Sequence, residues 1–171
     1  MAREHNEIVV MSGNTHPDLT DAICARLGLK RAQITLYHAG NRETMLCLPD
    51  TVRSRNVYIV QTATHTNVND AIMELLFMCY TCRTSAAKKI VGVLPYLPYS
   101  KQTKLFKRGA IASKLLAKMV SRSGFDHIIT VDLRHKEVRP KQLANLDIDS
   151  LCYRCKVSLI FLWTILEHLR S

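Results

Sequence analysis

Short apolar runs alternate with longer segments in which apolar residues recur every three or four positions. The short runs predict β-strands at 6–12 (NEIVVMS), 56–62 (NVYIVQT), 89–96 (KIVGVLPY) and 127–133 (HIITVDL). The last three runs are almost continuously apolar, which is typical of strands covered on both faces. We therefore expect these three strands to form the buried centre of a sheet.

The longer segments predict three helices between the strands. The text NTHP at 14–17 supplies a cap and a first-turn proline for a helix that ends at Gly28. The segment after Asn67 (VNDAIMELLFMCYTCRTSA) is apolar almost all the way round, so this helix should be buried on several sides, either between layers or against another subunit. In its first half, this second helix is interrupted by the polar residues Asn69, Asp70 and Glu74. A third, amphipathic helix starts near Ile111 and ends at Gly124.

Two further β-rich runs, QITLYH (33–38) and ETMLCL (43–48), are separated by AGNR and predict a hairpin or a short loop. Strands that alternate with helices and are covered on both faces indicate an α/β fold, with a mostly parallel sheet flanked by helices. In such sheets ligands bind beyond the carboxyl ends of the strands. The functional edge should therefore be formed by the loops that follow Gln61, Tyr96 and Leu133.

The loop after the strand at 89–96 concentrates positive charge, with no acid among its cations Lys101, Lys104, Lys107 and Arg108. The whole chain has a formal net charge of +10, which favours anionic partners such as nucleotides, phosphosugars, nucleic acid or acidic proteins. A solvated basic surface would give the same charge. Only Tyr99 and Phe106 lie near these cations as aromatic residues, and no recognised nucleic-acid motif accompanies them, so we expect no nucleic-acid binding.

The chain has 171 residues, the size of one domain. From about Val138 the strand-helix alternation stops, and a basic start, a short acidic patch and an apolar finish follow. A helix could start near Lys156. We therefore expect a folded domain at 1–137 and a divergent tail at 138–171.

Neither a membrane span nor a disulfide framework is expected. The longest apolar run, 157–166, is about half of the roughly 20 residues that cross a bilayer. The start of the chain has no apolar core of a secretory signal, which favours a cytoplasmic protein with reduced thiols. Cys79-x-x-Cys82 and Cys152-x-x-Cys155 imitate a zinc site, but the pairs lie much further apart than usual, and the first pair lies in an apolar helical run where thiols are ordinary packing residues.

Several long stretches of the chain resemble the phosphoribosyl pyrophosphate (PRPP) synthetase family, and within it the synthetase-associated, regulatory proteins. The resemblance covers roughly residues 7–137 and implies the amino-terminal one of the family's two phosphoribosyltransferase-type domains. The matching stretches are NRET (41–44), NVYIVQT (56–62), NDAIMELLFM (69–78), IVGVLPYLPYSKQTKLFKRGAI (90–111), SKLLAKMV (113–120) and HIITVDL (127–133).

The resemblance also implies a nucleotide site. In catalytic members a loop carrying Asn and Glu approaches the adenine and ribose of ATP, which matches Asn41 and Glu43. An Arg-Gln pair approaches the nucleotide phosphates, and this chain has Lys101 and Gln102 there, as the associated proteins do. Lys104 would add to the same phosphate-binding loop. Arg presents a planar fork of donors that binds phosphate in a fixed geometry, whereas Lys is a hydrated point charge. We therefore expect Lys101 still to attract phosphate but to hold it in a less defined position.

Two further departures bear on catalysis. Catalytic members carry Asp-Leu-His after the last strand, with the His helping to bind metal and triphosphate, whereas this chain reads Asp132-Leu133-Arg134. Arg134 cannot ligate Mg²⁺, and His135 is a weak substitute because successive residues of a strand end point to opposite faces. Nothing in 138–171 resembles the family's ribose 5-phosphate site, so we expect a truncated form with no metal site of its own.

The resemblance, with these departures, therefore implies a non-catalytic, regulatory subunit that associates with catalytic PRPP synthetase subunits in a homo- or hetero-oligomer. Its apolar second helix could supply the contact surface. The alternative is a working ribose-phosphate diphosphokinase that uses ATP and Mg²⁺. For this chain ATP and Mg²⁺ are expected to bind weakly, if at all.

Overall fold

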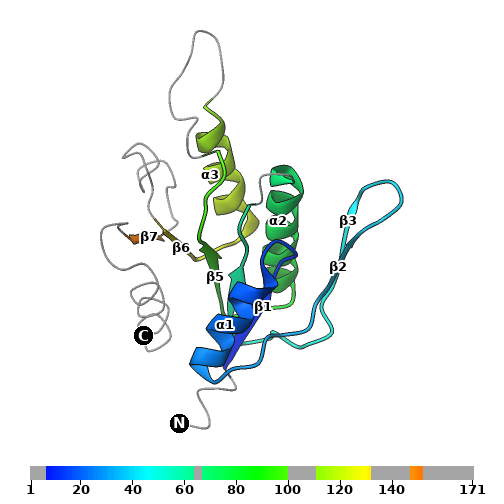
Figure 1. Ribbon diagram of the computed structural model, residues 1–171, viewed down its shortest axis with the longest axis vertical. Coiled ribbons are helices and arrows are strands. Elements are labelled where there is room, and N and C mark those ends of the chain that lie inside the picture. Colours follow the sequence, from blue (N-terminus) through cyan, green and yellow to red (C-terminus); the bar gives the residue numbers. More distant parts are fainter. Residues whose placement is uncertain (1–6, 64–66, 100–110, 132–146, 152–171) are drawn as a thin grey trace.

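The computed structural model describes residues 7–63, 67–99, 111–131 and 147–151, and it places helices on both faces of a parallel sheet (Figure 1). The helices are α1 (Pro17–Leu27), α2 (Val68–Thr84) and α3 (Ala112–Ser123). The strands are β1 (Ile8–Ser12), β2 (Thr35–His38), β3 (Thr44–Cys47), β4 (Asn56–Val60), β5 (Lys89–Leu94), β6 (His127–Val131) and β7 (Asp147–Leu151).

The main sheet has five strands in the order β1-β4-β5-β6-β7, and every neighbouring pair is parallel. After α1, Arg31 forms an isolated parallel β-bridge with Val10, on the edge of β1 that does not pair with β4. There the Ala32 N–H donates to the Val10 carbonyl at 2.8 Å. The crossover through α1 thus runs in the opposite direction to those through α2 and α3. Right-handed crossovers then place α1 on one face and the other two helices on the other, so the predicted α/β architecture is confirmed.

Alternating side chains of the strands divide the core into two layers. Val57 and Ile59 of β4 pack with α2 and α3, whereas Tyr58 and Val60 face the layer that α1 covers. Both faces of the central strands are buried, which explains their nearly continuous apolar sequence. Burial raises the pKa of Tyr58 to about 12.

The ends of two helices follow their sequence signals. Pro17 is the first residue of α1, and the preceding His16 side chain accepts a hydrogen bond from the Leu19 N–H at 3.2 Å. Gly28 ends α1 in the left-handed conformation (φ 68°), and Gly124 ends α3 at φ 112°. Both positions favour glycine because a Cβ is strained there, so the two predicted helix stops are confirmed.

The second helix carries the two cysteines of the first Cys-x-x-Cys pair into the core. Cys79 and Cys82 are fully buried, and the Cys82 Sγ lies 3.8 Å from the Met11 Sδ. Burial raises the pKa of each thiol to about 12, so both thiols are protonated at neutral pH and pack as apolar groups. Cys152 and Cys155 lie outside the described residues.

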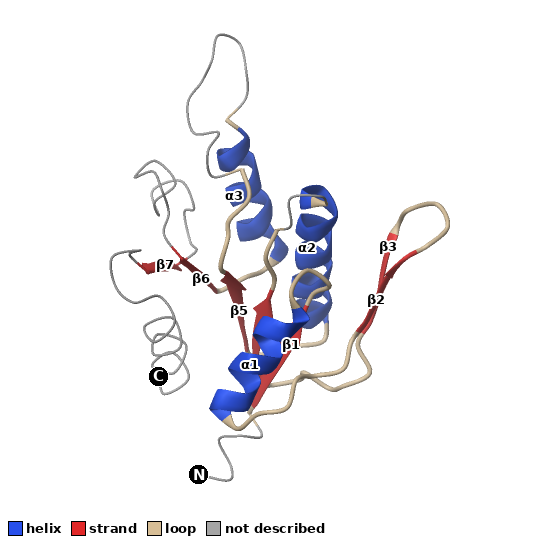
Figure 2. Cartoon of the chain, in the orientation of Figure 1, coloured by secondary structure: helices blue, strands red, loops and turns tan. Residues whose placement is uncertain are grey.

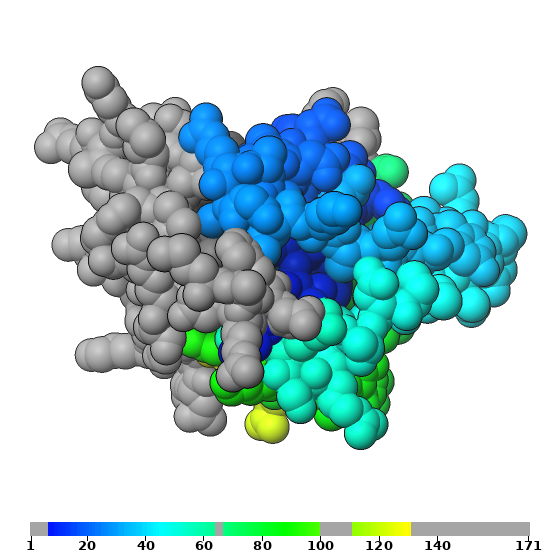
Figure 3. Space-filling model, turned by 90° about the horizontal axis from the view of Figure 1, so that it is seen from below, coloured from blue at the N-terminus to red at the C-terminus, as the bar shows by residue number. Residues whose placement is uncertain are grey.

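Of the two predicted possibilities, a hairpin or a short loop, the structure has the hairpin, a separate two-stranded antiparallel sheet with Thr35 opposite Cys47 and His38 opposite Thr44. It extends away from the main sheet on the α2 side (Figure 2). The space-filling view also shows it standing out from the body of the domain (Figure 3). Two strands with one exposed edge each gain little stability alone, so contacts with α2 must hold the hairpin in place.

The sheet has one strand that the sequence did not predict. We found no strand-helix continuation from about Val138, but β7 pairs with β6 in parallel, with Ile129 opposite Asp149. The segment DIDSL is short and half polar, so its sequence resembles a linker. Pairing gives the outer edge of β6 the backbone partners that it would otherwise lack.

No helix in the described ranges is long and apolar enough to cross a bilayer. The helix expected from about Lys156 lies outside the described residues. The boundary at 137 stays a prediction.

Candidate functional site

The carboxyl ends of β1 and β4 meet at one edge of the sheet, where the chain carries mainly polar residues. The Gly13 N–H donates to the Val60 carbonyl and the Gln61 N–H donates to the Val93 carbonyl, both at 3.1 Å, so hydrogen bonding continues one residue beyond the strands. Gln61 and Tyr96 lie at this edge as predicted. The third expected loop, after Leu133, lies outside the described residues.

A buried carboxylate, Glu74 of α2, stands at the centre of this edge with only 3% of its surface exposed. Its Oε2 accepts from the Gln61 Nε2 at 2.8 Å and from the Asn14 backbone N–H at 3.4 Å. Its Oε1 accepts from the Asn14 Nδ2 at 3.0 Å. Neutral amide donors thus satisfy a carboxylate that would be costly to bury unpaired.

Gln61 extends the network from α2 to the loop after β1. Its Nε2 also donates to the Ala71 carbonyl at 3.3 Å, and its Oε1 accepts from the Thr15 hydroxyl at 2.5 Å. The Thr15 oxygen in turn accepts from the Thr62 N–H at 3.1 Å. A Cβ at Gly13 would overlap the Gln61 amide, so any larger residue there would have to displace this amide from its hydrogen bonds.

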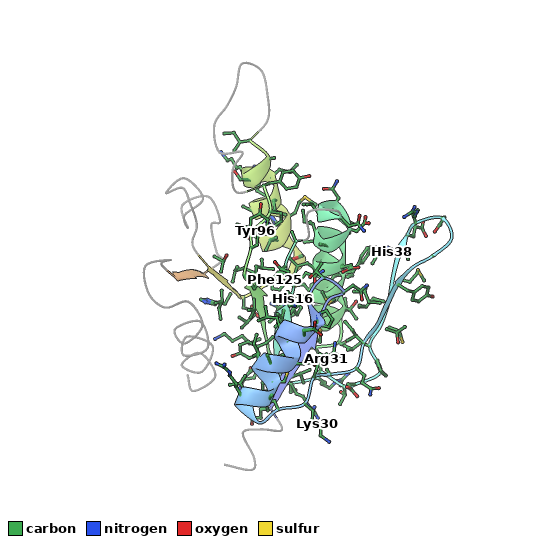
Figure 4. The ribbon with its side chains drawn as sticks, in the orientation of Figure 1. His16, Lys30, Arg31, His38, Tyr96 and Phe125 are labelled. Carbon is green, nitrogen blue, oxygen red and sulfur yellow. The ribbon has the colours of Figure 1, made fainter. Side chains whose placement is uncertain are left out.

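The same network reaches the hairpin. The Asn14 Nδ2 donates to the Leu36 carbonyl of β2 at 3.2 Å, and the His38 Nε2 lies 3.6 Å from the Glu74 Oε1. Figure 4 shows His38 between the hairpin and α2. Because Glu74 and Asn14 bind each other and both contact β2, they fix the hairpin relative to the edge of the sheet.

Two predicted site residues, Asn41 and Glu43, lie in the exposed turn of this hairpin. The Asn41 Oδ1 accepts from the Glu43 N–H at 3.1 Å, and the Ala39 N–H donates to the Glu43 carbonyl at 2.8 Å. Arg42 between them adopts φ 69°. The turn therefore brings Asn41 and Glu43 together and leaves the Glu43 side chain exposed.

The remaining predicted site residues are not described, so nothing places them relative to Asn41 and Glu43. They are Lys101, Gln102 and Lys104 of the basic loop, with Arg134 and His135 after β6. Tyr99 is the last described residue before the basic loop, and its hydroxyl donates to the Asn69 Oδ1 at 2.7 Å. Tyr99 has φ 58°, an uncommon conformation for a bulky residue, and this hydrogen bond to α2 helps to hold it.

The described side chains at this edge are hydrogen-bonded to one another. Within the described ranges, no three His, Cys, Asp or Glu side chains gather in a way that could hold a metal ion. The Glu74 network is the feature that sequence reasoning missed. The sequence shows Glu74 as a single acid within an otherwise apolar stretch of α2. The residues around it do not indicate that Asn14 and Gln61 are its partners.

Comparison with known proteins identifies the fold's family. The family model for the N-terminal domain of ribose phosphate pyrophosphokinase matches residues 8–124. The chain belongs to the ribose-phosphate pyrophosphokinase family. The match covers β1 through α3, and it confirms the expected amino-terminal, α/β domain of PRPP synthetases.

Similar proteins include both associated proteins and synthetases. Phosphoribosyl pyrophosphate synthase-associated protein 2 of Homo sapiens is 44% identical over 147 residues, which are 84% of this chain and 39% of that protein. Ribose-phosphate pyrophosphokinase 4 of Saccharomyces cerevisiae is 37% identical over 136 residues, which are 78% of this chain and 42% of that protein.

A solved structure shows the same arrangement. The crystal structure of phosphoribosylpyrophosphate synthetase from Mycobacterium smegmatis matches with a TM-score of 0.80 and 25% identity, covering 85% of this chain and 48% of that chain. The chain thus spans less than half the length of each of these relatives.

Proposed function

We propose that this chain is a non-catalytic, regulatory subunit that associates with catalytic PRPP synthetase subunits and modulates the supply of PRPP for nucleotide synthesis in the cytoplasm. One observation carries the proposal: 84% of the chain is 44% identical to a human protein named for its association with PRPP synthase. In the proposed layout, residues 1–137 form the family domain, and the divergent tail at 138–171 adds the strand β7 to the edge of its sheet.

Two sequence positions support the absence of catalysis. Arg134 occupies the place of the family's metal-binding His, and a cationic guanidinium repels Mg²⁺ instead of ligating it. Lys101 replaces the Arg that holds the nucleotide phosphates. Phosphoryl-type transfer depends on positioning and charge stabilisation, so a looser clamp lowers the rate more than it lowers binding.

Weak nucleotide binding is part of the proposal. The hairpin turn would present Asn41 and Glu43 to the nucleoside, and the basic loop would contribute Lys101, Gln102 and Lys104 to the phosphates. The Glu74 network supports this role because it holds the hairpin that carries Asn41 and Glu43 against α2.

A second candidate function is the ribose-phosphate diphosphokinase reaction itself, which converts ATP and ribose 5-phosphate to PRPP and AMP. The similarity to a yeast protein named ribose-phosphate pyrophosphokinase 4 favours it. Arg134 is the residue that argues against it.

The test of the proposal mixes the purified chain with purified catalytic PRPP synthetase. We expect the two to co-elute in size-exclusion chromatography with light scattering. The chain alone should form no PRPP from ATP, Mg²⁺ and ribose 5-phosphate, and adding it should change the activity of the catalytic subunits. Separate elution would contradict the proposed association, and PRPP formed by the chain alone would favour the second candidate.

The nucleotide site has its own test. Replacing both loop lysines, Lys101→Ala with Lys104→Ala, should weaken ATP binding in calorimetry by about tenfold, because two charge-assisted contacts to phosphate are lost. The matched control, Lys30→Ala with Lys88→Ala, removes two exposed lysines elsewhere and should leave the dissociation constant unchanged. If both variants bound ATP with the same dissociation constant, the basic loop would not be part of the nucleotide site.

A further inference from the structure

The exposed apolar side chains of the described residues gather on two helices. Eight large apolar residues are exposed, and five of them lie on α2 and α3. On α2 they are Met73, Phe77 and Tyr80, spaced so that they follow one side of the helix, and on α3 they are Leu115 and Met119, one turn apart. Leu115 is 60% exposed, and it lies beside Met73 and Met119 in one apolar patch instead of standing alone.

Between the two helices the surface is hollowed into a groove of about 360 Å³. Met73 of α2 lines one side and Leu115 and Met119 of α3 line the other, while Tyr99 closes part of it. Figure 1 shows α2 and α3 side by side on the face of the sheet opposite α1. The residues that line the groove are mostly apolar, and the Asn69 side-chain oxygen already accepts a hydrogen bond from the Tyr99 hydroxyl. The groove therefore offers few polar groups that could orient a small polar ligand.

One rim of the groove is positively charged. Lys114 and Lys118 are exposed and lie next to the two groove residues of α3, and Arg122 continues the row one turn later. The helix sequence ASKLLAKMVSRS contains no acid. Among the described residues none of these three cations forms an ion pair. An apolar groove flanked by these three cations is complementary to an amphipathic helix that has apolar residues on one face and carboxylates beside them.

The charges disfavour a second copy of this chain as the occupant. Two copies meeting through this face would bring two such basic rows together. The solvent side of α2 offers only Asp70 in compensation, because Glu74 is buried in its own network. With a net charge of +10 on each chain, self-association would also oppose long-range repulsion.

We propose that the α2–α3 groove, defined by Met73, Leu115 and Met119 with the rim Lys114 and Lys118, docks an acidic amphipathic helix of the catalytic PRPP synthetase subunit. This inference rests on the proposed association and adds the surface and the chemistry of the partner. Large apolar residues on successive turns of that helix fill the groove, and its Asp and Glu side chains lie along the basic rim.

The experiment measures the dissociation constant of the full-length chain and purified catalytic PRPP synthetase by biolayer interferometry at low and at moderate salt. Leu115→Ser with Met119→Ser should weaken binding about tenfold or more, since central apolar anchors dominate such interfaces. Lys114→Glu with Lys118→Glu should weaken it by a similar factor and flatten the salt dependence. Both pairs are exposed or half-exposed, and circular dichroism checks that each variant is folded.

The matched control reverses two exposed cations at the α1 end, Arg26→Glu with Lys30→Glu, on the opposite face of the sheet. It should bind within about twofold of the original chain. If the groove variants bind as well as this control, the groove is not the interface, although the proposed association stands. If the unaltered chain does not bind at all, both the association and the groove assignment are wrong. A dimer of the chain alone that Leu115→Ser with Met119→Ser dissociates would assign the groove to a second copy and overturn the proposal.

Discussion

Glu74→Ala is expected to lower the free energy of unfolding by about 2–3 kcal/mol. The change removes the acceptor for three hydrogen bonds from Gln61 and Asn14 and leaves space at a buried site. The loss is not larger because the Gln61 Nε2 keeps the Ala71 carbonyl and the Asn14 Nδ2 keeps the Leu36 carbonyl. Urea denaturation, read as a shift of the midpoint at constant slope, measures the effect.

Two variants make this result specific. Glu43→Ala is the same substitution at an exposed position of the hairpin turn, and it should change the free energy of unfolding by less than about 0.5 kcal/mol. Glu74→Gln keeps one acceptor oxygen and the side-chain shape, so it should fall between the two. If Glu74→Ala were as stable as Glu43→Ala, the network would not hold the edge of the sheet together.

The network also connects stability to the proposed site. Asn14 and His38 join Glu74 to the hairpin, and the hairpin carries Asn41 and Glu43 at its turn. Loosening the hairpin at its contacts with α2 would therefore displace the two residues that the family resemblance assigns to the nucleoside. If the proposed site is correct, Glu74 is a positioning residue for the hairpin that carries it.

Met78→Ala is expected to cost about 3 kcal/mol of unfolding free energy. The Met78 side chain has no exposed surface and packs in the layer between the sheet and the helices α2 and α3. Truncation removes its buried apolar surface and leaves a cavity that a close-packed core cannot fully close. The same urea measurement tests it.

The chain provides a matched control on the same helix. Met73 is 41% exposed on the groove side of α2, so Met73→Ala should change the free energy of unfolding by less than about 0.5 kcal/mol. Equal losses for the two variants would mean that the face of α2 carrying Met73 is part of the core, and the docking groove would lose one of its walls.

The elements of the fold follow from local sequence. Continuous apolar runs predicted β4, β5 and β6, and Pro17 with Gly28 predicted the limits of α1, because each of these signals acts through the backbone of neighbouring residues. The hairpin was predicted for the same reason. The text around 90–111 identified the family from the sequence alone.

The tertiary structure decided what depends on residues far apart in the chain. Glu74 meets Asn14 sixty positions away, and no periodicity of α2 records that contact. The sequence left open whether α2 faces core or partner, and folding divides it between buried Met78 and exposed Met73. The strand β7 forms because the edge of β6 accepts it, since pairing is a property of two segments while propensity is a property of one.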